Sequence, residues 1–244
     1  MKTVVTIEAR MCSTRLAGKV LKPILGRPLL ALLIERVQRV WQADQIVVAT
    51  TNKAADDPIA ELACQLGVGW FRGSEDDVLD RVLKAAQSVD AELIVETSGD
   101  CALIDPGVID QLIATFKCNS VDYCSNTLFR TYPRGMDAQI FPVAVLAQVA
   151  ELTEDPPDRE HVSLYIYEHP ERFRLLNVAS GLASEVADLR LTVDTPEDFD
   201  LVRLVYEELY PGNPEFNLSD MLDLFRRRPE LRVINQNITQ KAVR

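Results

Sequence analysis

Short apolar runs alternate with stretches of helical character through the first half of this chain. The runs have the length and composition of buried strands, and they cover residues 4–7, 45–50 and 92–96. Helical spacing or helix-start residues mark the stretches after them, at 57–66, at 74–88 and from Pro106 onward. Strands that alternate with helices form a parallel sheet with right-handed crossovers. We therefore predict an α/β fold with a mostly parallel, Rossmann-like sheet flanked by helices.

The chain has enough apolar residues for one sizeable core. Its 244 residues are 47% hydrophobic, and no internal repeat or low-complexity linker divides them. After Cys124 the pattern becomes polar and contains a Tyr-Pro-Arg-Gly turn, followed by a strand-like stretch at 138–141. We expect a single domain over residues 1–244, with a subregion at about 126–142 that projects from the sheet as a β-arm. Further helices are expected at 143–151, 159–168, 196–209 and 218–227.

The overall charge is acidic. The chain has 26 Lys and Arg against 37 Asp and Glu, a net charge of −11, which disfavours general binding to nucleic acids or anionic membranes. Its five cysteines form no Cys-x-x-Cys pair and it has two histidines, which fits a reducing compartment and disfavours a structural zinc site. The sequence opens on a strand rather than a signal segment, and no apolar run approaches the roughly 20 residues of a membrane span. These features predict a cytoplasmic protein without a nucleic-acid or membrane partner.

A segment rich in cations and hydroxyls follows the first strand. Its cations are Arg10, Arg15 and Lys19, and its hydroxyls are those of Ser13 and Thr14. Guanidinium groups offer forked donors that match phosphate oxygens, and an ammonium adds a compact charge. The segment has neither of the glycine-rich phosphate-loop patterns, so side chains must do most of the holding. A solvated basic loop is the alternative. The position at a strand end, where open α/β sheets bind ligands, favours a triphosphate clamp.

Two aspartates far apart in the sequence follow expected strands. Asp100 comes shortly after the run at 92–96, and Asp194 ends an apparent strand at 190–193. Carboxylates at strand ends face one crevice, and Mg²⁺ is commonly held by one or two carboxylates together with substrate phosphates. Each residue has a structural alternative, because Asp100 can belong to an ordinary turn and Asp194 precedes a helix start at Thr195. The pair is our candidate magnesium site.

Taken together, these segments resemble the cytidylyltransferases that activate acidic sugars, of the acylneuraminate and 3-deoxy-manno-octulosonate type. The branch named after a spore coat polysaccharide biosynthesis protein is the most similar in pattern. The resemblance covers nearly the whole chain, and its motifs lie in order at residues 9–19, 23–28, 47–51, 71–74, 76–79, 99–106, 132–137, 159–162 and 191–198. It implies a nucleotidyltransferase fold of the GT-A-like type. It also implies that the projecting arm helps to build the acceptor site and joins two subunits as a homodimer.

The resemblance carries roles onto the matching residues. It implies that Asp100 and Asp194 bind catalytic Mg²⁺, and that the catalytic set is Arg10, Arg15, Lys19 and Asp100. It also implies a pyrimidine site around the backbone of Ala9 and residues near Thr50, Thr51 and Ser98. Arg72 follows a strand end, and both a ligand-orienting role and a surface ion pair are open for it. The nucleotide-binding set is therefore Ala9, Arg10, Ser13, Thr14, Arg15, Lys19, Thr50, Thr51, Arg72, Ser98 and Asp100.

Candidate acceptor residues lie in and after the polar turn. Tyr132, Arg134 and Asp137 offer a hydroxyl, a guanidinium and a carboxylate, which together can recognise a polyol that bears a carboxylate. Turn formation explains part of this motif. His161 can contact the acidic sugar, accept a proton, or cap and pack the start of a helix.

The implied reaction is nucleotidyl transfer. A sugar hydroxyl attacks the α-phosphorus of CTP in line, pyrophosphate leaves and a CMP-sugar forms, while Mg²⁺ and the cations stabilise phosphate charge. CTP and an acidic sugar are the expected partners, in surface polysaccharide or glycan biosynthesis. Two alternatives stay open. One is a nucleotide-sugar-dependent glycosyltransferase, for which 198–200 offers an Asp-x-Asp pattern inside an expected helix. The other is a non-catalytic nucleotide-binding regulator.

Three positions depart from the family pattern. Cys12 stands where glycine is usual, and Ala17 and Ala102 stand where proline is usual, which is expected to loosen two ligand loops. Glu96 and Ser98 lie in a segment that often carries other polar residues. This difference leaves the class of sugar more open than the nucleotidyl chemistry.

Overall fold

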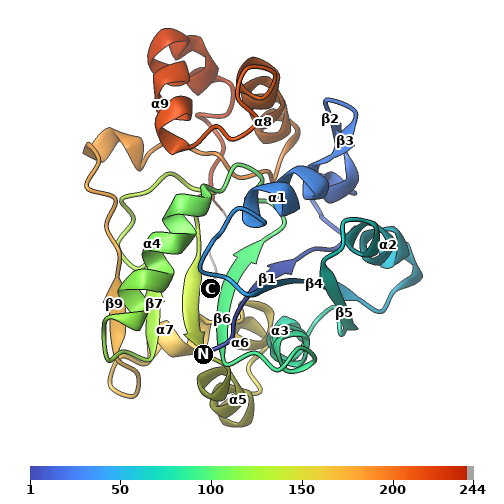
Figure 1. Ribbon diagram of the computed structural model, residues 1–244, viewed down its shortest axis with the longest axis vertical. Helices are drawn as coiled ribbons and strands as arrows, with labels where there is room; N and C mark the ends of the chain where they lie inside the picture. Colours follow the sequence, from blue (N-terminus) through green and yellow to red (C-terminus); the bar gives the residue numbers. More distant parts are fainter. Residues whose placement is uncertain (241–244) are drawn as a thin grey trace.

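Within residues 1–240, which the computed structural model describes, a seven-stranded sheet runs through the middle of the molecule (Figure 1). Its order is β5-β4-β1-β6-β8-β7-β9. The strands are β1 (Thr3–Glu8), β4 (Gln45–Thr51), β5 (Gly69–Gly73), β6 (Leu93–Ser98), β7 (Tyr123–Ser125), β8 (Gln139–Pro142) and β9 (Leu175–Asn177). Among them, β8 runs antiparallel to β6 and β7, and the other pairings are parallel. The predicted mostly parallel α/β sheet is confirmed.

Helices cover both faces of this sheet. On one face lie α1 (Leu29–Val37), α2 (Asp57–Gln65) and α4 (Pro106–Lys117). The opposite face is covered by α3 (Val78–Gln87), α5 (Val143–Leu152), α6 (Pro156–Glu160) and α7 (Leu164–Glu168). A third apolar cluster holds α8 (Pro196–Leu209) and α9 (Leu218–Arg227), at the top of Figure 1. The short strands β2 (Pro23–Ile24) and β3 (Arg27–Pro28) form a separate pair.

Two sequence features explain these elements. Successive apolar side chains of a strand face opposite sides of the sheet, and capping residues stand where helices begin. In β1, Val5 and Ile7 face the cluster under α1 and α4, whereas Val4 faces the cluster under α3. A parallel strand buried on both faces reads as a near-continuous apolar run, and residues 4–7 of β1 do so apart from Thr6, which is also buried. Asp105 caps α4 by accepting from the N–H of Gly107 at 2.8 Å, and Thr195 caps α8 through a capping box.

The structure contradicts the expected position of one strand. Residues 139–142 form β8 inside the sheet, between β6 and β7, so the expectation that this stretch projects as part of a β-arm is wrong. The reason is that β8 is apolar on both sides: Ile140 packs in the cluster on one face of the sheet and Phe141 in the cluster on the other. The segment at 126–138 is a connection without a strand of its own, and Phe129 in it is exposed.

Two further elements differ from the expectation. The expected helix at 159–168 is divided into α6 and α7 by a break at 161–163. The expected strand at 190–193 is paired, within the described part of the chain, through a bridge between Arg134 and Arg190. This bridge joins the 126–138 segment to the chain that leads to α8.

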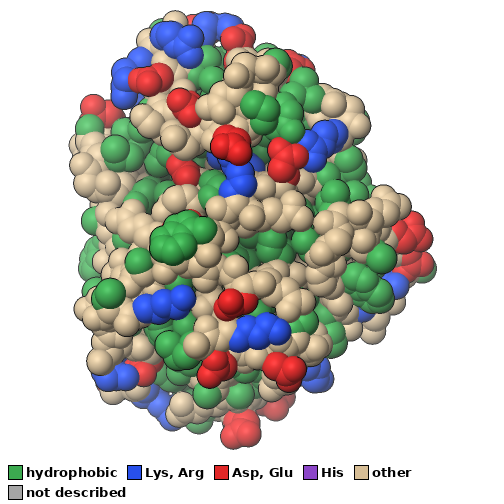
Figure 2. Space-filling view, in the orientation of Figure 1, with side chains coloured by type: hydrophobic (Ala, Val, Ile, Leu, Met, Phe, Trp, Pro, Cys, Tyr) green, Lys and Arg blue, Asp and Glu red, His purple; other side chains and the backbone are tan. Residues whose placement is uncertain are grey.

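The surface has a mixed charge. On the face drawn in Figure 2, acidic and basic side chains are interspersed, without a broad field of one sign. This distribution agrees with the net charge of −11 and gives no continuous basic surface on that face. Among the helices of residues 1–240, none combines the length and the apolar character needed to cross a bilayer.

Gly135 sets how closely the 126–138 segment approaches the chain before Asp194. Its φ is +95°, and a Cβ there would lie 2.5 Å from the carbonyl carbon of Leu191. We expect Gly135→Ala to lower the free energy of unfolding by more than about 2 kcal/mol, because two backbone segments must move apart. Gly181→Ala is the matched control: its φ is +67°, but nothing lies within 4 Å of the added Cβ. The control should lose about 1 kcal/mol, and equal losses in urea unfolding would contradict this account.

Candidate active site

The basic segment folds back on itself at the carboxyl end of β1. The N–H of Gly18 donates to the carbonyl oxygen of Met11 at 2.9 Å, which closes the loop. Asp56, just before α2, accepts from the N–H of Met11 at 2.7 Å and from the hydroxyl of Thr51 at the end of β4. The Asp56 carboxylate therefore holds the segment against the strand ends. The sequence did not identify Asp56 as a site residue, because an aspartate just before a helix looks like an ordinary turn residue.

The ammonium of Lys19 lies between the two candidate metal ligands. Its Nζ is 3.2 Å from Oδ2 of Asp100 and 3.0 Å from Oδ1 of Asp194, and it donates to the carbonyl oxygen of Val193 at 2.6 Å. Burial opposes the charge on Lys19, but the two carboxylates outweigh burial and raise the pKa of the ammonium. Burial would likewise raise the pKa of Asp100, but Lys19 and the Ser98 hydroxyl hold it below its usual value. Lys19 and Asp100 are therefore both charged at neutral pH.

Asp194 also receives two arginines. Its Oδ2 lies 3.0 Å from Nη2 of Arg15 and 2.7 Å from Nη2 of Arg190. The cap of α8 is Thr195, so the Asp194 carboxylate is left for these cations. The backbone explains the convergence, because the N–H of Val193 donates to the carbonyl oxygen of Asp100 at 3.0 Å. The structure thus brings together four residues of the predicted site: Arg15, Lys19, Asp100 and Asp194.

The donor set of this cluster fits Mg²⁺ shared with a phosphate. One oxygen each of Asp100 and Asp194 converges on a single point, which the Lys19 ammonium now holds. Carboxylate oxygens are hard ligands of the kind that Mg²⁺ prefers. Within residues 1–240, no three His, Cys, Asp or Glu side chains gather as a metal site. Two carboxylates are enough for Mg²⁺, which commonly completes its ligand shell with substrate phosphates and water.

Two predicted cations lie away from this cluster. Arg10 extends toward the α3 and α6 side, where its guanidinium is 3.9 Å from Glu75 and 3.9 Å from Glu160. Arg72 donates to the carbonyl oxygens of Thr51 and Lys53, each at 2.8 Å, and pairs with Asp57 at 2.6 Å. Of the two roles that the sequence left open for Arg72, the ion pair is present.

The remaining nucleotide candidates line the ends of the central strands. The N–H of Ala9 donates to the carbonyl oxygen of Ala49 at 3.3 Å, and Thr50 follows on the same strand. Oγ1 of Thr50 is buried and has no hydrogen-bond partner among the described residues. In the basic segment, Ser13 is half-buried and Thr14 is exposed. These groups border the same strand ends as the charged cluster.

The four acceptor candidates do not come together at one point. The hydroxyl of Tyr132 donates to Gln111 on α4 at 3.0 Å, and the side chain lies in the core. Asp137 forms a two-pronged ion pair with Arg130, at 2.7 and 3.1 Å. His161 is exposed where α6 ends.

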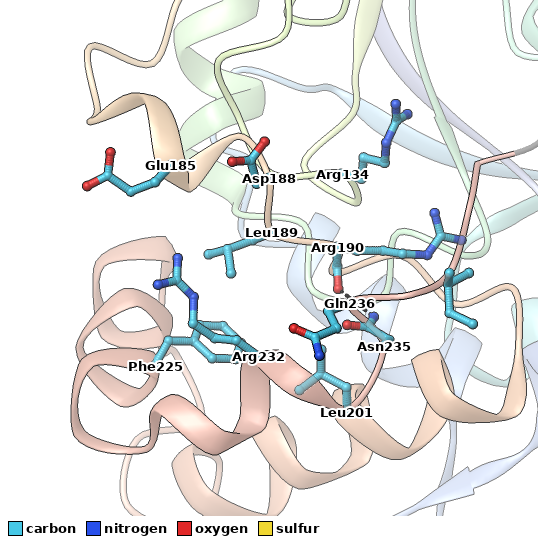
Figure 3. A pocket seen from close by; sticks show the side chains of 11 residues that line it. Arg134, Glu185, Asp188, Leu189, Arg190, Leu201, Phe225, Arg232, Asn235 and Gln236 are labelled. Atoms are coloured by element: carbon cyan, nitrogen blue, oxygen red, sulfur yellow. Dashed lines mark hydrogen bonds between the residues drawn. The ribbon is translucent and has the colours of Figure 1, made fainter.

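Arg134 is the acceptor candidate that lines a cavity. The cavity has a volume of about 410 Å³, and Arg190 and Asn235 also line it (Figure 3). Burial, followed by the charge of Arg130, lowers the pKa of Arg134. Because Arg190 also contacts Asp194, this cavity adjoins the charged cluster.

Two glutamates, one buried and one half-buried, lie on the α3 side of the sheet. Glu96 on β6 is 7% exposed, and burial raises its pKa to about 7 against the hydrogen bonds of Gln139 and Ser163. Glu8 on the neighbouring strand β1 has a pKa well above its usual value, through burial and then through the charge of Glu96. Sequence reasoning noted Glu96 as a departure but did not pair it with Glu8.

Glu96 is expected to make stability depend on pH. Between about pH 4.5 and pH 7 the folded protein keeps a proton on Glu96 that the unfolded chain releases, so stability falls as pH rises through this window. Glu96→Gln should therefore be more stable than the wild type at pH 8, by about 3 kcal/mol, and equally stable near pH 4. Urea unfolding at both pH values measures this, with the exposed Glu61→Gln as control. An equal shift at both pH values would rule out the titration.

Comparisons with known proteins agree with the resemblance that the sequence motifs indicated. A family model described as cytidylyltransferase matches residues 4–210. The chain is 32% identical over 229 residues to the spore coat polysaccharide biosynthesis protein SpsF of Bacillus subtilis, covering 92% of this chain and 94% of that protein. It is 26% identical over 249 residues to the 3-deoxy-manno-octulosonate cytidylyltransferase of Geobacter metallireducens, covering 83% and 96%.

A solved structure is similar over almost the whole chain. It is a cytidylyltransferase from Leptospira borgpetersenii serovar Hardjo-bovis, with a TM-score of 0.91 and 32% identity over 99% of this chain and 100% of that one. The resemblance inferred from the order of the sequence motifs is thereby confirmed. On the family match, the relatives and this structure together, the chain belongs to the cytidylyltransferase family of enzymes.

Proposed function

We propose that this protein transfers the cytidylyl group of CTP to an acidic sugar in a Mg²⁺-dependent reaction that releases pyrophosphate. The observation that carries the proposal is the position of Lys19 between Asp100 and Asp194. The names of two relatives support the kind of acceptor, since one is a 3-deoxy-manno-octulosonate cytidylyltransferase and the other a spore coat polysaccharide biosynthesis protein. The CMP-sugar product would serve surface polysaccharide or glycan synthesis.

The basic segment binds the triphosphate in this proposal. Arg15 and Lys19 turn donors that now bond to carboxylates toward phosphate oxygens. Arg10, whose guanidinium now faces Glu75 and Glu160, is the third cation of the proposed clamp. The acceptor oxygen forms a bond to the α-phosphorus while the bond from that phosphorus to pyrophosphate breaks. Negative charge grows on the phosphates in the transition state, and positioned cations stabilise it there more than in the ground state. When bound at Asp100 and Asp194, Mg²⁺ supplies Lewis-acid polarisation of phosphate oxygens.

The other site residues complete the proposal. Ser13 and Thr14 add hydroxyl donors to the triphosphate clamp. The base is held at the ends of β1, β4 and β6, around Ala9, Thr50, Thr51 and Ser98, and Arg72 is a candidate for orienting the ligand. The acceptor is recognised from the 126–142 subregion and the α6 end, with Tyr132, Arg134, Asp137 and His161 as the candidates. Arg134 has the strongest support among them, because it lines the cavity that adjoins the charged cluster. A single domain, a homodimer and a cytoplasmic location remain part of the proposal.

Pyrophosphate release tests this function. Purified protein is incubated with CTP, Mg²⁺ and one acceptor at a time from a panel of 3-deoxy-octulosonate, nonulosonic acids, phosphonates and sugar phosphates. We expect pyrophosphate and a CMP-linked product with at least one carboxylate-bearing sugar, and much less with ATP, GTP or UTP. Binding of CTP that is unchanged by Mg²⁺, with no pyrophosphate from any acceptor, would favour the non-catalytic regulator.

The glycosyltransferase alternative loses its motif in the fold. Its Asp-x-Asp pattern begins at Asp198, which is fully buried and bonded to Arg190 at 2.9 Å. The second aspartate, Asp200, pairs with Arg203 on the surface of α8. The two carboxylates therefore serve the helix start and the helix surface.

A further inference from the structure

We propose that Arg190 is a positioning residue that sets the orientation of Asp194 and, through it, the affinity of the site for a divalent ion. The inference rests on the proposed function, because it takes Asp194 as a metal ligand. Nothing in the sequence pattern assigned Arg190 a role. The argument uses a chain of buried polar contacts that runs from Asp194 to the C-terminal part of the protein.

The two carboxylate oxygens of Asp194 contact different cations, and Arg190 bonds to one of them. Its Nη2 is 2.7 Å from Oδ2, whereas Oδ1 is left to the Lys19 ammonium at 3.0 Å. The Arg190 side chain is 6% exposed, so this contact is largely shielded from water. A shielded, charge-assisted contact fixes a carboxylate far better than an exposed ion pair.

Asp198 fixes Arg190 and the backbone of Asp194 at once. Its Oδ1 is 2.9 Å from Nε of Arg190 and its Oδ2 is 3.1 Å from Nη2, which is the two-pronged geometry that a guanidinium allows. The same Oδ2 accepts from the N–H of Asp194 at 3.0 Å. Asp194 is therefore held at its backbone by Asp198 and at its carboxylate by Arg190, and the buried charges of Arg190 and Asp198 balance.

The C-terminal part of the chain closes this network. The amide of Asn235 donates to Oδ1 of Asp198 at 2.8 Å and to the carbonyl oxygen of Arg190 at 2.9 Å. Gln240 accepts from Nη1 of Arg190 at 2.6 Å. Figure 3 shows Arg190 and Asn235 coming from separate segments at the wall of the cavity. Residues that follow α9 thus support a ligand that precedes α8.

Arg190→Lys tests the positioning role, because lysine keeps the charge but cannot bond to two carboxylates in fork geometry. The readout is free Mn²⁺, followed by its electron paramagnetic resonance signal, in the presence of CTP and without acceptor. Changing a residue that orients a metal ligand typically costs 10–100-fold in affinity. We expect the Mn²⁺ dissociation constant to rise about tenfold or more, while CTP binding without metal stays within about twofold of the wild type.

Gln240→Ala provides a second, milder variant if Arg190→Lys does not fold. It removes one contact of Arg190 and should raise the Mn²⁺ dissociation constant about threefold. Gln236→Ala is the matched control, since Gln236 is an exposed glutamine of the same segment that lines the cavity without a bond to Arg190. Unchanged Mn²⁺ affinity in Gln240→Ala and in a folded Arg190→Lys protein would overturn the inference. A wild-type protein that takes up no Mn²⁺ with CTP would overturn the proposed function instead.

Discussion

Asp100→Asn and Asp194→Asn are each expected to lower kcat by at least about 1,000-fold while the fold stays intact. The amide keeps the size of the side chain but removes the negative charge that faces Lys19 in the structure. A divalent ion bound to the triphosphate would then lose a charged ligand, and the transition state would lose the stabilisation that this ion provides. Pyrophosphate release at saturating CTP and acceptor measures the effect, with circular dichroism as the test of folding.

Asp122→Asn is the control for these two variants. Asp122 pairs with Arg174 just before β7 and takes no part in the charged cluster, so turnover of the Asp122→Asn variant should match the wild type. Near-normal turnover in Asp100→Asn or Asp194→Asn would remove that residue from the mechanism. A variant that loses both activity and secondary structure does not test the mechanism. In that case the Mn²⁺ titration is carried out on the variant that stays folded, and the conclusion rests on it alone.

Lys19→Met is expected to have two separate effects. Turnover should fall at least about 100-fold, because the triphosphate loses a cation in the transition state. Without metal, the protein should also lose about 2 kcal/mol of stability, since the largely buried carboxylates of Asp100 and Asp194 are left without their shared partner. Added Mg²⁺ should restore part of that stability, because a divalent ion can take the place of the ammonium.

Thermal unfolding with and without Mg²⁺ separates these effects. Lys22→Met is the matched control, as its ammonium lies over the ring of Phe199, 5.4 Å from the centre, outside the cluster. We expect Mg²⁺ to raise the melting temperature of Lys19→Met by several degrees more than that of the wild type or the control. The same small response in all three proteins would show that the ammonium does not hold a metal position.

The bounds of the last two helices could be predicted to the residue, because local sequence signals mark where these helices begin. α8 and α9 span the predicted ranges, 196–209 and 218–227, and each begins with a capping box at Thr195 or Asn217. The position of β8 could not be predicted in this way. Which strands become neighbours depends on contacts between distant segments, and a polar turn before a short strand carries no information on sheet order.

The charged cluster could be predicted in part. Four of its residues come after strands or lie in the motifs, namely Arg15, Lys19, Asp100 and Asp194. A parallel sheet brings the residues that follow its strands together at one edge. Their supporting residues could not be predicted, because their role depends on tertiary pairing. The sequence pattern places Arg190 in a strand and gives no sign of a contact with Asp194. In the structure Arg190 holds Asp194, and Arg190 is itself positioned by the 126–138 segment and by the C-terminal part of the chain.

The departures from the family pattern lie in different surroundings. Cys12 and Ala17 are exposed on the basic segment. Ala102 is fully buried, and its carbonyl oxygen accepts a hydrogen bond from the hydroxyl of Tyr206 at 2.7 Å. This buried contact ties the loop after Asp100 to α8.

The central claim is that the basic segment and the two aspartates share one nucleotide and one divalent ion. The most direct measurement is a crystal structure of the protein with CTP and Mn²⁺, in which anomalous scattering locates the metal. We predict one peak within bonding distance of Asp100, Asp194 and a phosphate oxygen, with Arg15 and Lys19 on the triphosphate. A triphosphate that contacts neither cation, or a metal peak that touches neither aspartate, would contradict the account.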